Sequence, residues 1–183
     1  MDFTQVLGHK STIENLQNAI KKGQVSHSYL FEGEESIGKR MVALSFAKTL
    51  LCKKQGLQPC NNCNSCLKFD NFNHPDFELI EPEKDKIKRD EIKNIIDNIN
   101  IAPLESPRRI FIIDNSDKIG VEGQNALLKT LEEPPSYINI ILITSNINKL
   151  IPTILSRCER IKFYPVETKK IGEFLVSKYD KTI

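Results

Sequence analysis

Residues 33–40 have the sequence GEESIGKR, and this stretch decides which fold class the chain is expected to adopt. It matches the phosphate-binding loop (P-loop) pattern G-x-x-x-x-G-K-[ST] at Gly33, Gly38 and Lys39. The last position of the pattern normally supplies a hydroxyl that ligates Mg²⁺. Here that position is Arg40, whose side chain has only hydrogen-bond donors and cannot ligate a cation. The sequence therefore predicts the scaffold of a nucleotide-binding loop without its metal chemistry.

The residues on either side of this loop fit a strand and a helix. Residues 28–31, SYLF, are an apolar and aromatic run short enough for a buried strand. After the loop, apolar residues recur at helical spacing at Met41, Val42, Leu44, Ala47 and Leu51. A strand, a glycine loop and a helix direct backbone N–H groups and a helix N-terminus toward an anion. An ordinary glycine turn between a strand and a helix is the alternative interpretation.

The rest of the chain alternates between predicted strands and helices. Further strands are predicted at residues 77–80, 109–114, 138–143 and 161–163. Helices are predicted from a capping box at residues 11–14 to Gly23, at about 89–100, and around 126–131. Several of the strands are apolar throughout, which favours a parallel sheet covered by helices on both faces. Gly33, Asp114 and Thr144 should then meet at the carboxyl ends of the strands.

Asp114 ends a predicted strand in the way that metal-binding acids do in P-loop ATPases. In those enzymes a strand-end acid holds Mg²⁺, and a neighbouring glutamate often activates the attacking water. Asp114 could hold Mg²⁺ or merely cap a turn, but the next residue is Asn115, which cannot act as a general base. Arg40 and Asn115 are two departures at linked positions. They predict a site that does not hydrolyse ATP, and we expect no bound ATP or ADP.

Four cysteines lie within fifteen residues, at Cys52, Cys60, Cys63 and Cys66. Four thiolates at this spacing predict a closed, structural Zn²⁺ site in a module at about residues 52–75. Disulfides or a redox-active C-x-x-C pair are weaker alternatives in a cytosolic protein. His74 is not needed as a ligand, so we expect it at the surface or at a cap. Cys158 lies far from the others and is expected to be buried.

Composition limits the remaining function classes. The chain has 183 residues, of which 39% are hydrophobic and 27% charged, as in an ordinary globular protein. Its net charge of +2 gives no support for extended, nonspecific DNA binding. No segment resembles a signal peptide or reaches the ~20 apolar residues of a membrane helix. We therefore expect a cytoplasmic protein with no membrane partner.

Longer blocks of sequence are similar to a known family. Residues 27–31 (HSYLF), the cysteine module, residues 125–135 (NALLKTLEEPP) and residues 154–158 (ILSRC) occur in this order. Together they resemble the AAA+ clamp-loader subunits of bacterial DNA polymerase III. The resemblance implies an α/β, RecA-like P-loop domain over residues 1–165, with the zinc module inserted at about 52–75. Residues 166–183 would begin a helical lid domain that is cut short.

This family contains two kinds of subunit that share these blocks. The gamma and tau motor subunits keep an intact P-loop and an Asp-Glu pair, whereas the delta-prime kind has a degenerate P-loop. Arg40 and Asn115 resemble the delta-prime kind. The resemblance then implies a non-hydrolysing member of the five-subunit ring that loads the sliding clamp on primed DNA. Its partners would be gamma/tau and delta subunits within the DNA polymerase III holoenzyme, a nucleotidyltransferase.

Arg157 acquires a role only through this resemblance. By sequence alone, an arginine at a helix end is usually a surface charge or a partner of the helix C-terminus. The family implies that Arg157, preceded by Ser156, is an arginine finger that reaches the ATP site of a neighbouring motor subunit. Two alternatives remain: an active gamma/tau-type ATPase with variant motifs, and an unrelated zinc-stabilised nucleic-acid-binding module.

Overall fold

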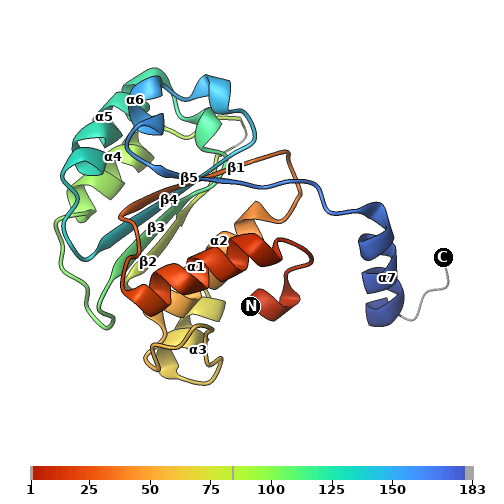
Figure 1. Cartoon of the computed structure of the whole chain (residues 1–183). Coiled ribbons are helices and arrows are strands. Elements are labelled where there is room, and N and C mark those ends of the chain that lie inside the picture. Colours follow the sequence, from red (N-terminus) through yellow and green to blue (C-terminus); the bar gives the residue numbers. More distant parts are fainter. Residues whose placement is uncertain (1, 84, 180–183) are drawn as a thin grey trace.

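A five-stranded parallel β-sheet forms the centre of the chain in the computed structural model, which describes residues 2–83 and 85–179 (Figure 1). The strands are β1 (Ser28–Glu32), β2 (Phe77–Ile80), β3 (Arg109–Ile113), β4 (Ile138–Thr144) and β5 (Glu159–Lys162). They lie in the order β2-β3-β4-β1-β5, and every pair is parallel. The predicted fold class is therefore confirmed.

Helices cover both faces of this sheet. They are α1 (Lys10–Lys22), α2 (Lys39–Leu51), α3 (Asn64–Asp70), α4 (Arg89–Asn98), α5 (Val121–Glu132), α6 (Pro152–Leu155) and α7 (Thr168–Tyr179). Short 3-10 turns occupy Phe3–Gln5, Ser116–Lys118 and Ile147–Lys149. Helices α1 and α2 pack on one face, and α4, α5 and α6 on the other (Figure 1). None of these helices is both long and apolar enough to cross a membrane within the described residues.

Alternation along the strands supplies the two hydrophobic cores. In β3, Ile110 and Ile112 join the core under α1 and α2, whereas Phe111 and Ile113 join the core under α4 and α5. All residues of β1 and β4 are buried, as expected for central strands covered on both faces. The carboxyl ends of β1, β3 and β4 consequently meet at one edge, where Gly33 N–H donates to the Thr144 carbonyl (3.3 Å).

The first helix begins earlier than its sequence predicts. The expected capping box at residues 11–14 is wrong, because α1 starts at Lys10 and follows His9 in a left-handed conformation (φ 54°). The His9 ring donates from Nε2 to the Ile37 carbonyl of the P-loop (2.6 Å) and lies 4.9 Å from the ring centroid of Phe163. These contacts with distant segments fix the start of the helix, so local capping residues do not decide it.

Helix α7 follows β5 and lies to the side of the sheet (Figure 1). Three apolar side chains on it are exposed, at Ile171, Leu175 and Val176. A division of the chain at residue 165 into a P-loop domain and the start of a lid stays a prediction.

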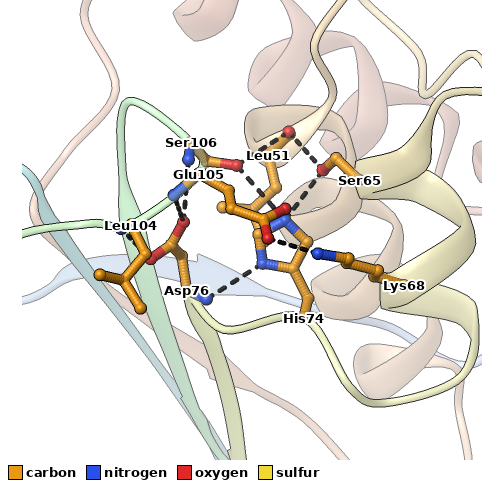
Figure 2. Close-up of polar contacts among 8 residues, drawn as sticks. All are labelled: Leu51, Ser65, Lys68, His74, Asp76, Leu104, Glu105 and Ser106. Atoms are coloured by element: carbon orange, nitrogen blue, oxygen red, sulfur yellow. Dashed lines mark hydrogen bonds and ion pairs between the residues drawn. The ribbon is translucent and has the colours of Figure 1, made fainter.

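A buried polar network joins the cysteine module to the sheet (Figure 2). Asp76 is fully buried, and its carboxylate accepts hydrogen bonds from the backbone N–H groups of Leu104 (2.6 Å), Glu105 (2.8 Å) and Ser106 (2.8 Å). Charge-assisted bonds of this kind compensate for the cost of burying an anion. The loop that precedes β3 is therefore fastened to the segment that precedes β2.

His74 lies beside Asp76, and its hydrogen bonds specify one neutral tautomer. The Asp76 N–H donates to Nδ1 (3.1 Å), so Nδ1 carries no proton. The hydroxyls of Ser65 and Ser106 both donate to the Leu51 carbonyl (2.7 and 3.3 Å). Their oxygens can thus accept from Nε2–H, at 3.0 and 3.3 Å. The expected surface place for His74 is wrong, because the residue is buried and two of its three hydrogen-bond partners, Ser65 and Ser106, come from segments that only the fold brings together.

Burial lowers the pKa of His74, and this predicts a pH-dependent stability. The unfolded chain binds a proton near the ordinary histidine pKa of ~6.5, whereas the folded chain binds it only at lower pH. The contribution of neutral His74 to the free energy of unfolding is therefore complete above pH ~6.5 and is lost as the pH falls below that value. The free energy of unfolding, measured by urea denaturation from pH 7.5 to 5, should decrease accordingly. In His74→Gln, whose new side chain does not titrate, the free energy of unfolding should decrease less steeply with falling pH. An identical pH dependence in both proteins would contradict this assignment.

Candidate functional site

The P-loop connects β1 to α2 and needs glycine at two positions. Gly33 has φ 155°, and a Cβ there would lie 2.7 Å from the Phe163 carbonyl oxygen. Gly38 has φ 101° and forms the N-cap of α2. Left-handed backbone of this kind strongly favours glycine. The structure thus places the predicted loop between a strand and a helix N-terminus, the arrangement that the sequence pattern requires.

Lys39 folds back onto the loop that carries it. Its Nζ donates to the carbonyl oxygens of Gly33 (2.6 Å) and Glu34, and the residue is only 6% exposed. Burial lowers its pKa, and nearby Asp114 opposes this shift. Two of the three ammonium donors are therefore taken by carbonyl groups of the loop itself, where a phosphate would otherwise accept.

Arg40 occupies the position that normally supplies a metal ligand, and it pairs with two acids. Its Nη1 lies 2.6 Å from Glu81 Oε1 and 3.7 Å from Asp114 Oδ2. Asp114 also accepts from the Asn115 N–H (2.9 Å), so it caps a turn as well. Burial raises the pKa of Asp114, while Arg40 acts in the opposite direction. The positive charge beside Asp114 is therefore that of Arg40, a residue of the same chain.

Glu81 is part of this arrangement and was not predicted. The signal was available, because Glu81 directly follows β2, just as Asp114 directly follows β3. Ile80 pairs with Ile113 in the parallel register, so the two acids project from neighbouring strand ends. What the sequence could not give was the strand order that makes β2 and β3 neighbours.

A cavity of about 460 Å³ adjoins the loop. Its walls include Lys39, Arg40, Asp114, Asn115 and Thr144. Thr144 Oγ1 donates to Asp117 (2.9 Å), as does the Ser145 N–H (3.2 Å), so Asp117 fixes the end of β4. The structure thus brings together the predicted P-loop residues and the predicted strand-end groups.

The four cysteines of the module also converge, as predicted. The sulfur atoms of Cys52, Cys60, Cys63 and Cys66 all lie within 4.8 Å of one another. Tetrahedral zinc with Zn–S bonds of ~2.3 Å requires sulfurs ~3.8 Å apart, which is close to this spacing. The Cys66 N–H lies 3.5 Å from the Cys63 sulfur, and a backbone hydrogen bond from Asn62 lowers the pKa of Cys60 to about 6. The four residues fit a closed metal site of structural type.

A buried lysine ties this module to α2. The Lys48 side chain is fully buried, and its Nζ donates to Asn61 Oδ1 (2.6 Å) and to both carboxylate oxygens of Asp70 (2.8 and 2.7 Å). Asn61 lies between two of the cysteines, and Asp70 ends α3. Burying a charge is costly unless it is paired, so this contact requires the module to be folded against α2. The prediction missed Lys48, although a lysine within the mostly apolar residues 41–51 was a visible signal.

Arg157 lies apart from both the cavity and the cysteines. It follows the single turn of α6, and its Nη1 donates to the Thr153 carbonyl (2.8 Å) and lies 3.4 Å from Ser156 Oγ. Its Nη2 forms an ion pair with Glu132, the last residue of α5. Cys158, next to it, is half-buried rather than fully buried, and burial raises the pKa of its thiol to about 12.

Replacement of one cysteine of the module should release the metal. Cys63→Ser removes a thiolate ligand, and structural zinc contributes directly to folding free energy. We expect loss of stoichiometric zinc, measured by mass spectrometry of the metal content, and a lower melting temperature. Cys158→Ser is the matched control, because it makes the same change outside the module and should keep the zinc. Equal zinc content in the two variants would disprove the site.

Comparison with known proteins identifies the family. The family model for the DNA polymerase III delta subunit matches residues 8–167. The delta' subunit of DNA polymerase III from Bacillus subtilis (strain 168) is 37% identical over 163 residues, which are 89% of this chain and 50% of that protein. The tau subunit of the same organism is 36% identical over 170 residues, or 92% of this chain and 30% of that protein.

A solved structure shows the same relationship. The crystal structure of a DNA polymerase III gamma subunit-related protein from Thermotoga maritima superposes with a TM-score of 0.62 at 25% identity. The match covers 91% of this chain and 49% of that one. This chain thus spans half or less of the length of these relatives. The fold and the extent of the family match agree, and the chain belongs to the family of bacterial DNA polymerase III clamp-loader subunits.

Proposed function

We propose that this chain acts as a non-hydrolysing, delta-prime-type subunit of the clamp loader. It helps to load the sliding clamp on primed DNA, and it supplies Arg157 to the ATP site of a neighbouring gamma/tau subunit. The observation that carries this proposal is the position of Arg40 between Glu81 and Asp114.

The physical argument concerns the metal that accompanies ATP. In P-loop NTPases, Mg²⁺ bridges the β- and γ-phosphates and is held by the P-loop hydroxyl and a strand-end aspartate. Here the aspartate faces a guanidinium that carries a permanent positive charge. A divalent cation at this place would be repelled by Arg40 and would lack the hydroxyl ligand. Asn115 supplies no general base, so both requirements of hydrolysis are missing.

Arg157 supports a role in trans. It is a permanently charged, planar donor on the surface at the end of α6, away from the P-loop of its own chain. An arginine supplied by a partner stabilises charge on the transferred phosphoryl group and can accelerate hydrolysis by ~10³–10⁵. In this proposal gamma/tau and delta subunits are the direct partners in the cytoplasmic replisome, and the clamp and primed DNA are contacted through the assembled ring. The zinc ion has a structural role.

A gamma/tau-type ATPase with variant motifs is the second candidate. It is favoured by the cavity beside Lys39 and by an identity to a tau subunit (36%) that nearly equals that to a delta' subunit (37%). Nucleotide binding separates the two candidates, because a motor subunit must bind Mg²⁺-ATP tightly.

Calorimetric titration with ATP, with and without Mg²⁺, tests the role of Arg40. We expect no binding, or weak binding that Mg²⁺ does not strengthen. Arg40→Thr restores the hydroxyl and frees Asp114, so its affinity for ATP should rise at least about tenfold when Mg²⁺ is added. Arg89→Thr, on an arginine whose side chain is 75% exposed on α4, is the control and should behave as the unaltered chain. Tight, Mg²⁺-dependent binding by the unaltered chain would instead favour the motor subunits.

Arg157→Ala tests the action in trans. In a clamp loader reconstituted with the protein at its natural full length, this change should abolish the share of DNA-stimulated ATPase activity that depends on the adjoining site. Arg157→Lys should restore little, because an ammonium lacks the planar fork of donors. Folding should change little, since a partly exposed ion pair contributes about 1 kcal/mol or less. Arg89→Ala is the matched control, and an ATPase that Arg157→Ala leaves unchanged would eliminate the finger assignment.

A further inference from the structure

Arg157 is held against its own subunit by acceptors from two helices. The Thr153 carbonyl, four residues earlier, accepts from Nη1 at 2.8 Å, so the guanidinium is turned back along α6. The Glu132 carboxylate, at the end of α5, pairs with Nη2. Helices α5 and α6 lie next to each other on the same face of the sheet (Figure 1). As a result, only 29% of the Arg157 side chain is exposed, although it lies at the surface.

Glu132 and a polyphosphate would compete for the same group. Both present anionic oxygens to a guanidinium, whose donors form a rigid, planar fork. A phosphate placed against this fork would approach the negative charge of Glu132 unless that carboxylate moved away. Glu132 has its side chain 47% exposed, so solvent can take over its hydrogen bonds when it is displaced.

We propose that Glu132 is an intramolecular latch on Arg157. It holds the guanidinium against α6 until the polyphosphate of a nucleotide bound to the neighbouring subunit replaces it. This inference rests on the proposed role of Arg157 in trans. With a latch, Arg157 is free to meet ATP for only a fraction of the time. The apparent Kd of the neighbouring site for ATP is then the intrinsic Kd divided by that fraction. The free energy of an exposed ion pair of this type corresponds to a change in the apparent Kd for ATP by a factor of about two to five.

The test is the ATP dependence of ATPase activity in the reconstituted clamp loader, with this protein at its natural full length. Glu132→Gln keeps the shape of the side chain but removes its charge. The KM for ATP should fall about two- to fivefold while kcat at saturating ATP is unchanged. The shift should become smaller at high ionic strength, because salt screens the pair that the variant lacks. Glu133→Gln, the same change at the exposed neighbouring residue, is the control and should leave KM unchanged.

Four further outcomes are decisive. A lower kcat in Glu132→Gln, as in Arg157→Ala, would mean that Glu132 positions the finger productively, and would overturn the latch. An unchanged KM would overturn it as well, while a fall in activity with Arg157→Ala would still uphold the finger. Activity that Arg157→Ala leaves unchanged would overturn both proposals. In the Arg157→Ala background, Glu132→Gln should no longer shift KM, and a remaining shift would count against the latch.

Discussion

The pairing of β4 between β1 and β3 is the constraint on which the rest of the structure depends. β4 forms parallel ladders on both of its edges, and all its residues are buried. A strand covered on both faces requires helices above and below, which the chain provides on either side. Because the ladders are parallel, the ends of three strands meet at one edge. Gly33 and Thr144, far apart in the sequence, thereby become hydrogen-bonded neighbours.

At that edge, the charge of Arg40 departs from the P-loop pattern. Asp114 is mostly buried and needs a nearby positive charge, which Arg40 supplies together with a bond to Glu81. In an ATPase that charge arrives with the nucleotide as Mg²⁺. Here it is covalently part of the chain, so a positive charge lies beside the strand ends whether or not a nucleotide is present. A charge that does not depend on a bound nucleotide is consistent with the non-hydrolysing role proposed above.

Helix α2 connects the P-loop to the cysteine module. Its first residues are Lys39 and Arg40, and its C-cap is Cys52, one of the four converging cysteines. The module holds this end of the helix through Lys48 and through Ser65, whose hydroxyl donates to the Leu51 carbonyl. Ser106, in the loop before β3, donates to the same carbonyl. The cysteine site and the buried network of His74 therefore fix the direction of the helix whose other end forms the loop. This is a structural reason for a cysteine cluster at the end of α2 opposite the P-loop.

The sequence by itself determined the fold class, the loop and the cysteine cluster, because each depends on local spacing: 3.6-residue periodicity in helices, apolar runs in strands, and C-x-x-C steps. It also showed that Arg40 and Asn115 depart from the ATPase pattern. Only the tertiary structure decided which partners these residues meet. The pairs of Arg40 with Glu81 and of Arg157 with Glu132, and the burial of His74, join segments brought together by strand order and helix packing. Contacts of this kind leave no periodic signal in the sequence, since each partner is fixed by the path of the whole chain.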